Sequence, residues 1–211
     1  NSTGIDPSLR KQKMKKILIA AAVGMLVAGQ VAAQESPWLV RARAVYIETV
    51  NQDSGTGLDL NVSNKTIPEV DISYFFNKNV AAELVLTVPQ KQTVYQGNGT
   101  RVGTFKHLPP TLTAQYHFTN FNGFKPYVGA GLNFTKIGSE RLGGVSLSNN
   151  SIGAALQAGV DIPLTKQLSF NVDVKKVYIK THVYNGAYGT GDLGTLKIDP
   201  VLLGVGVGYR F

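Results

Sequence analysis

The sequence predicts an all-β fold, an eight-stranded antiparallel transmembrane β-barrel with short periplasmic turns and long extracellular loops. Three observations support this fold class. Eight segments alternate apolar residues with polar or small ones at a period of two, as strands do because successive side chains point to opposite faces. The connectors between these segments alternate between short and long, which is typical of outer-membrane barrels. The last segment carries an unbroken apolar face to the final residue.

The final segment, residues 201–211, shows the pattern most clearly. One face is apolar throughout and ends in Val207, Tyr209 and Phe211, which we expect to form the C-terminal assembly strand. The other face consists mostly of glycine. In a barrel, such a strand would turn its apolar band to lipid and its small residues to a narrow lumen. A soluble antiparallel strand has the same period, so this segment alone leaves that alternative open.

The composition limits the remaining classes of protein. The 211 residues suffice for one domain or one small barrel, 43% of them are hydrophobic, and there is no cysteine. The absence of cysteine excludes a disulfide framework, thiolate catalysis and cysteine-bound metal. Residues 1–33 hold five Lys or Arg and one acid, so they carry half of the net charge of +8. The other basic residues form no stripe, and nucleic-acid binding is not indicated.

The amino-terminal residues have the organisation of a secretory signal. Met14 and two lysines precede a short apolar run, and small residues around Ala33 offer a cleavage point. The run is too short for a convincing membrane-spanning helix. We therefore predict an upstream or expression-derived extension at 1–13, a cleaved signal peptide at 14–33 and the barrel at 34–211. Export of this kind places the barrel in the outer membrane of a Gram-negative cell.

The strand-like segments and their connectors decide between a barrel and a soluble sandwich. The predicted strands are residues 38–47, 70–76, 82–87, 112–118, 127–134, 152–162, 168–175 and 201–211. The connectors at 77–79, 119–123 and 163–167 are short, and those at 48–65, 88–106, 139–150 and 181–195 are long and polar. A soluble sandwich has no reason to sort its loops by side. The strict alternation over an even number of strands favours the barrel.

Several blocks of the sequence resemble those of a known family. They include Lys106-His107-Leu108-Pro109-Pro110-Thr111, Pro126-Tyr127-Val128-Gly129-Ala130-Gly131 and Gly204-Val205-Gly206-Val207-Gly208-Tyr209-Arg210-Phe211. In sequence and order they are similar to the signature blocks of the outer membrane protein W family, across the whole chain after Ala33. The resemblance implies an eight-stranded outer-membrane barrel that passes small, mostly hydrophobic molecules.

The predicted lumen-facing side of the strands carries polar and charged residues. An eight-stranded barrel has an interior just wide enough for its own side chains or one small ligand, which excludes a water-filled general porin. Buried charges must be paired, so an interlocked salt-bridge and hydrogen-bond network is the main interpretation. A selectivity ring lining a path is the alternative. The predicted network comprises Arg41, Arg43, Asp71, Glu83, Gln115, His117, Asp161, Asp173 and Lys175.

Three prolines suggest a weak point in the barrel wall. Pro89 closes the third predicted strand, and Pro109 and Pro110 open the fourth. Proline donates no ladder hydrogen bond, and unpaired backbone in a bilayer is tolerated only where it lines a cavity or faces protein. One hypothesis is therefore a lateral gap through which an apolar solute leaves the lumen into the membrane. The alternative is that these prolines lie above the bilayer and only shape a loop.

Two functional hypotheses follow from these patterns. The first is a passive channel for small hydrophobic or weakly polar molecules that needs no cofactor. Its candidate apolar lining is Leu39, Val45, Ile47, Leu58 and Leu60. The second is a structural or adhesion barrel that transports nothing and whose extracellular loops bind partners. A contiguous apolar path would favour the channel, and a closed charge network would favour the structural barrel.

Other chemistry has weaker support. His107, His117 and His182 lack the paired spacing of metal ligands, so no metal site is predicted. No local motif indicates a catalytic triad, and an enzyme is not expected. The expected partners are outer-membrane lipid and a small hydrophobic solute, with the barrel most simply a monomer. The basic loop residues Lys91, Arg101 and Lys106 suggest additional contacts with lipopolysaccharide phosphates.

Overall fold

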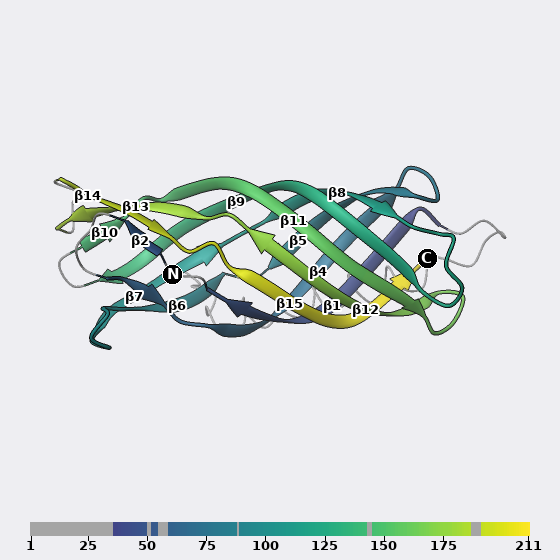
Figure 1. The fold of residues 1–211 in the computed structure, drawn as a ribbon, viewed down its shortest axis with the longest axis horizontal. Helices are drawn as coiled ribbons and strands as arrows, with labels where there is room; N and C mark the ends of the chain where they lie inside the picture. Colours follow the sequence, from purple (N-terminus) through teal and green to yellow (C-terminus); the bar gives the residue numbers. More distant parts are fainter. Residues whose placement is uncertain (1–35, 50–51, 55–58, 88, 143–144, 187–190) are drawn as a thin grey trace, which may run out of the picture. The chain divides into compact units, whose positions relative to one another are not determined.

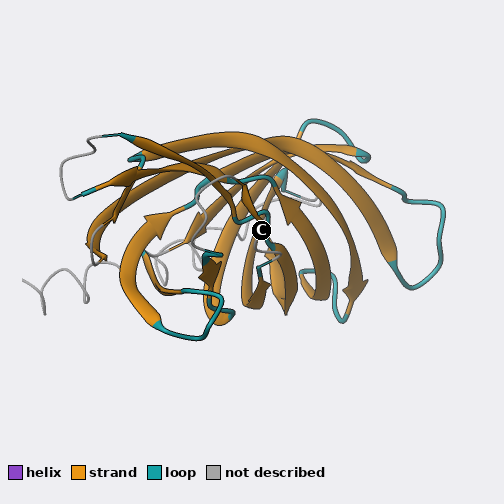
Figure 2. Ribbon diagram, turned by 60° about the vertical axis from the view of Figure 1, so that its left-hand side comes forward, coloured by secondary structure: helices purple, strands orange, loops and turns teal. Residues whose placement is uncertain are grey.

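The structure is a computed structural model that describes residues 36–49, 52–54, 59–87, 89–142, 145–186 and 191–211. The predicted extension at 1–13, the predicted signal peptide at 14–33 and Leu58 lie outside the described residues. Pro37–Arg210 forms one compact unit, built from strands without a described helix (Figure 2). Accordingly, no helix long and apolar enough to cross a membrane occurs in the described part of the chain.

Eight strands form a closed antiparallel ring, which confirms the predicted fold class. The ring strands are β1 (Trp38–Glu48), β4 (Lys65–Phe75), β5 (Val80–Thr87), β8 (Thr111–His117), β9 (Lys125–Leu142), β11 (Asn150–Pro163), β12 (Leu168–Val177) and β15 (Val201–Arg210). Each ring strand pairs with the next one along the chain, and β15 returns to pair with β1. The closure gives every ring strand a paired neighbour on each side, as a membrane-spanning sheet requires.

The seam between β1 and β15 depends on glycine. The two strands pair over ten residues, from Leu39 opposite Arg210 to Glu48 opposite Val201. A Cβ atom on Gly206 would lie 2.1 Å from the carbonyl oxygen of Ala42 and 2.7 Å from the Cα of Arg43. Real Cβ atoms do not approach backbone so closely, so only glycine permits this approach. The small face predicted for the last strand therefore serves to close the ring.

The long connectors contain further strands at one end of the ring, on the left in Figure 1. These strands are β2 (Gln52–Ser54), β3 (Asn61–Val62), β6 (Gln90–Tyr95), β7 (Arg101–Leu108), β10 (Val145–Leu147), β13 (Lys180–Asn185) and β14 (Asp192–Lys197). β7, β6 and β3 continue the ring sheet from β9, whereas β10, β13, β14 and β2 form a separate four-stranded sheet. The connectors are long, as predicted, but much of their length is regular hairpin.

The outer face of the ring is apolar. Large exposed hydrophobic residues occur on all eight ring strands, among them Val70, Leu84, Leu112, Leu132, Leu156, Val172, Val205 and Val207. Aromatic residues flank this band: Trp38, Phe76, Phe118, Phe121 and Phe124 lie towards the short turns, and Tyr46, Tyr95, Phe134 and Tyr178 lie towards the long connectors. Such a band with two aromatic girdles matches the hydrocarbon core of a bilayer and its two interfaces.

Candidate functional site

Arg41 lies at the centre of a charged cluster inside the ring. Its guanidinium group contacts Asp71 at 3.2 Å, Glu83 at 3.2 Å and Asp161 at 2.7 Å, and it donates a hydrogen bond to the hydroxyl of Ser73 at 3.0 Å. These partners come from β4, β5 and β11, and the Arg41 side chain is fully buried. One planar guanidinium thus joins three strands through the fork of donors that arginine provides.

Arg43 and Lys175 extend this cluster towards the long connectors. Arg43 pairs with Asp71, with Glu83 at 2.9 Å and with Asp173 at 3.0 Å. Lys175 pairs with Glu69 at 3.2 Å. We refer to Arg41, Arg43, Glu69, Asp71, Glu83, Asp161, Asp173 and Lys175 together as the charge network. All eight side chains are buried, and three cations face five carboxyl groups.

Neutral side chains complete the network across the lumen. Gln157 of β11 donates hydrogen bonds to Glu83 at 2.9 Å and to Asp173 at 2.8 Å. Its carbonyl oxygen accepts a hydrogen bond from Gln115 at 3.0 Å, and Gln115 in turn contacts the ring of His117 at 3.0 Å. With these contacts, six of the eight ring strands place a side chain in the network, and β15 contributes the glycines that make room for it.

The structure brings all nine predicted lumen residues into this one buried cluster. Sequence reasoning missed Glu69, which pairs with Lys175, because the second predicted strand begins at Val70. The structure begins β4 at Lys65, and its alternating burial continues through Ile67 and Glu69. The period-two pattern, extended one residue upstream, places Glu69 beside Asp71 on the inner face.

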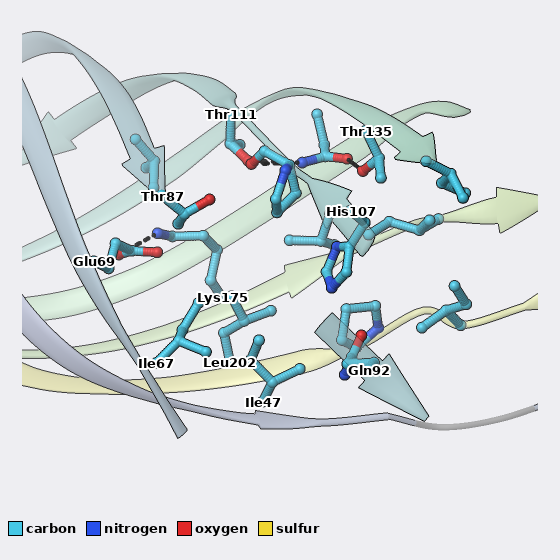
Figure 3. Close-up of a pocket in the computed structure, with 18 of the residues that line it drawn as sticks. Ile47, Ile67, Glu69, Thr87, Gln92, His107, Thr111, Thr135, Lys175 and Leu202 are labelled. Carbon is cyan, nitrogen blue, oxygen red and sulfur yellow. Dashed lines mark hydrogen bonds and ion pairs between the residues drawn. The ribbon is translucent and has the colours of Figure 1, made fainter. Parts of the chain in front are cut away.

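A cavity lies on the long-connector side of the charge network (Figure 3). The cavity has an empty volume of about 580 Å³, a value that includes space open to solvent. Eleven of its 19 lining residues are apolar: Ile47, Ile67, Val85, Phe105, Pro109, Ile137, Val177, Ile179, Ile198, Pro200 and Leu202. The two charged lining residues, Glu69 and Lys175, pair with each other. The cavity is therefore an apolar chamber with an ion pair on its network side.

The residues predicted to form an apolar lining are spread over the barrel. Ile47 lines the cavity, and Val45 packs beside it in a cluster with Ile67. Leu60 is buried in the larger apolar cluster that Phe105 and Ile137 also join. Leu39 lies at the opposite end of β1, in a cluster with Phe75 and Ala81, beyond the charge network. Leu58 lies outside the described residues.

The predicted proline positions coincide with an interruption of the barrel wall. The pairing of β5 with β8 runs from Val80 opposite Tyr116 to Val85 opposite Thr111. Pairing between the continuing strands β6 and β7 begins only at Gln90. In the part of the chain that the structure describes, no strand pairing joins Leu86 or Thr87 to the segment that contains Pro109 and Pro110. Pro89 is exposed beside this segment, and Pro109 lines the cavity.

The segment that contains Pro109 and Pro110 is hydrogen-bonded to β9, its neighbour on the side away from β5. The side-chain amide of Asn133 on β9 donates hydrogen bonds to the carbonyl oxygens of Pro109 and Pro110, each at 3.3 Å. The backbone N–H of Phe134 also donates to Pro110 at 2.9 Å. The interruption thus lies between β5 and the proline segment, whereas the contact with β9 is maintained.

Comparison with known proteins agrees with this architecture. The model of the OmpW family matches residues 28–211. An uncharacterized outer-membrane protein of Sinorhizobium fredii, y4mB, is 46% identical over 86% of this chain and 82% of its own length. Outer membrane protein W of Escherichia coli is 32% identical over 94% of this chain and its whole length.

The fold also matches a solved barrel. The crystal structure of the outer membrane protein OprG from Pseudomonas aeruginosa superposes with a TM-score of 0.72 at 24% identity, covering 85% of this chain and 98% of that one. The ring of eight strands, its apolar outer band and the family match over most of the sequence lead to one assignment. This chain belongs to the OmpW family and is an integral β-barrel protein of the outer membrane.

Proposed function

We propose that this protein is a passive channel for small hydrophobic or weakly polar molecules, which leave the lumen sideways near Pro89, Pro109 and Pro110. The observation that carries the proposal is the position of the apolar cavity. It lies between the buried charge network and the interrupted wall, and Pro109 and Thr87 from the two sides of the interruption line it. A solute in the cavity would thus be beside the membrane before it met the charges.

Passage straight through the barrel is opposed by the charge network. An apolar molecule that moved past Arg41 would have to separate it from carboxylates at 2.7–3.2 Å. Separated charges in a dry interior cost several kcal/mol each. The same molecule gains free energy by entering lipid, at about 25 cal/mol per Å² of apolar surface removed from water. Lateral exit is therefore the route with the smaller barrier.

The alternative of a non-transporting structural barrel draws support from the same network. A closed charge network is the feature expected of a structural barrel, and a contiguous apolar path is the feature expected of a channel. The structure contains the network and, further along the strands, an apolar cavity: on β1, Arg41 and Arg43 join the network and Ile47 lines the cavity. A structural barrel needs no cavity beside an unpaired wall, so the cavity favours the channel.

The first test measures entry of a labelled apolar solute, such as n-octane, into intact Gram-negative cells that express the protein. Uptake is corrected for cells that carry an empty vector. The double substitution Pro109→Thr/Pro110→Val restores two N–H donors and β-branched side chains, which favours pairing with β5. It should reduce the protein-dependent uptake several-fold.

Pro163→Thr is the matched control, because Pro163 is an exposed proline at a short turn. It should leave uptake as in the unchanged protein. Wild-type barrel that is folded in the outer membrane but gives no uptake above the empty vector would refute the channel. Full uptake by the double variant would instead refute the lateral exit.

We also propose that the β6–β7 hairpin of this channel contacts lipopolysaccharide. Lys91 and Lys106 are exposed and directly opposite each other on β6 and β7, and Arg101 is exposed on the same hairpin. Like charges opposite each other on a sheet are destabilising. Phosphate groups of the outer leaflet would relieve this repulsion through charge-assisted hydrogen bonds. We therefore place this hairpin at the level of those phosphates.

A further inference from the structure

Most uncharged polar groups around the cavity are paired with one another. Asn133 donates to the hydroxyl of Thr111 at 2.9 Å as well as to the two proline carbonyls. Thr135 donates to the side-chain oxygen of Asn133 at 2.6 Å. The amide of Gln92 donates to the carbonyl oxygen of Ser63 at 2.8 Å. These groups are satisfied within the protein and need no ligand.

Two polar atoms of the cavity wall are exceptions. The hydroxyl oxygen of Thr87 and the Nε2 atom of His107 are buried and have no hydrogen-bond partner among the described residues. The His107 side chain is 8% exposed, and both residues line the cavity (Figure 3). Buried polar atoms in proteins are nearly always paired, so each unpaired one calls for an explanation. A bound molecule with a polar group of its own would supply the missing partner.

The chemistry of the two atoms defines that polar group. Burial, together with the nearby charge of Lys65, lowers the pKa of His107 to about 4, so its imidazole is neutral at neutral pH. Neutral imidazole has one donor and one acceptor nitrogen, and a threonine hydroxyl is both donor and acceptor. A hydroxyl group on the ligand can donate and accept, and it therefore fits either imidazole tautomer. An ionised group would lose its hydration in an apolar chamber whose charged residues already pair with each other.

We propose that the cavity recognises apolar molecules that carry a neutral hydroxyl group, and prefers them to hydrocarbons of the same size. The apolar body would pack against side chains such as Ile67, Val85 and Leu202, and the hydroxyl would bond to Thr87 or His107. Pockets of this kind bind through apolar surface and gain specificity from a few polar groups. This inference rests on the proposed channel function and narrows its solute class to alcohols and phenols.

The transport test compares 1-octanol with n-octane in the intact-cell assay. The unchanged protein should accelerate octanol uptake more than octane uptake, by roughly three- to tenfold, as expected for one or two hydrogen bonds. Thr87→Val keeps the shape of the side chain and removes its hydroxyl, so it should lower this ratio. Thr87→Ser keeps the hydroxyl and should retain the ratio. Equal acceleration of both solutes by the unchanged protein would overturn the preference, and the same ratio in all three proteins would overturn the role of Thr87 in it.

A spectroscopic test reads the contact directly. The chain has three histidines, so the imidazole ¹⁵N signals of the protein in lipid nanodiscs can be assigned with one variant for each. Octanol should shift the Nε2 signal of His107, and octane at equal lipid loading should not. His117 and His182 report any general effect of the solvent. No selective shift at His107, together with an unchanged uptake ratio in Thr87→Val, would overturn the proposal even if octane uptake supported the channel. Absence of all uptake would refute the channel itself.

Discussion

Arg41 shows how one side chain ties the barrel together. It contacts Asp71, Glu83 and Asp161, which come from three different strands, and its side chain is fully buried. The inward orientation of Arg41 was predictable, because Arg41 and Arg43 alternate with apolar residues that form the outer face of the strand. Which carboxylates it meets was not predictable, since Asp161 lies 120 residues further along the chain. Only closure of the ring decides that pairing.

We predict that Arg41→Met destabilises the barrel by roughly 3–5 kcal/mol, because three buried carboxylates would lose a partner. Arg41→Lys should recover only part of this loss, since an ammonium group cannot reproduce the planar fork. Urea unfolding in lipid vesicles, followed by tryptophan fluorescence of Trp38, measures the change. Lys166→Ala in an exposed turn is the control. An Arg41→Met protein as stable as the control would show that the contacts are energetically unimportant.

At the scale of the strands, the sequence pattern predicts the ring strands but not the outer strands of the long connectors. The eight ring strands were predictable because one face of each meets lipid and stays apolar. The sequence predicts polar connectors where the outer strands lie, because no continuous apolar face marks β6 or β7. Their inward residues, Val94 and Phe105, instead pack in the apolar cluster inside the barrel. The apolar residues of β6 and β7 are too few to show a period of two in the sequence. The two strands are instead ordered by their pairing with each other.

The β1–β15 seam gives a prediction at this scale. Gly206→Ala would place a Cβ 2.1 Å from backbone of β1, and the overpacking should cost roughly 1–3 kcal/mol. Gly204→Ala is the matched control on the same face of the same strand, because its Cβ would meet only side-chain atoms, the nearest being the Cδ of Arg43 at 3.3 Å. Heat-induced unfolding on a gel separates the folded and unfolded forms. Equal midpoints for the two variants would argue against a special role for Gly206.

At the scale of the whole molecule, the barrel is divided along its axis. The network half is filled by paired charges, and the other half holds the cavity and the apolar cluster. The sequence indicated the polar half through its inward charges. The sequence could not predict the cavity, because a cavity forms where side chains from distant strands leave space unfilled.

This division predicts almost no ion conduction. An interior filled with side chains leaves no continuous water column, so the folded barrel in a planar bilayer should show conductance of KCl close to that of bare lipid. Single-channel recording measures it, with a water-filled porin as the positive control. Stable unitary steps in KCl would mean that the charge network opens, and passage along the axis would then replace the lateral route.

The Arg41–Asp161 contact also bears on how the chain reaches its native state. Its two partners lie 120 residues apart, so the strands between them must be in place before these charges are neutralised. An incomplete sheet would expose unpaired charges to lipid, which makes partly assembled forms unstable. Contacts between distant residues slow folding because the chain entropy is lost first. We expect slow insertion in a single cooperative step, which the pairing of the final strand with β1 completes.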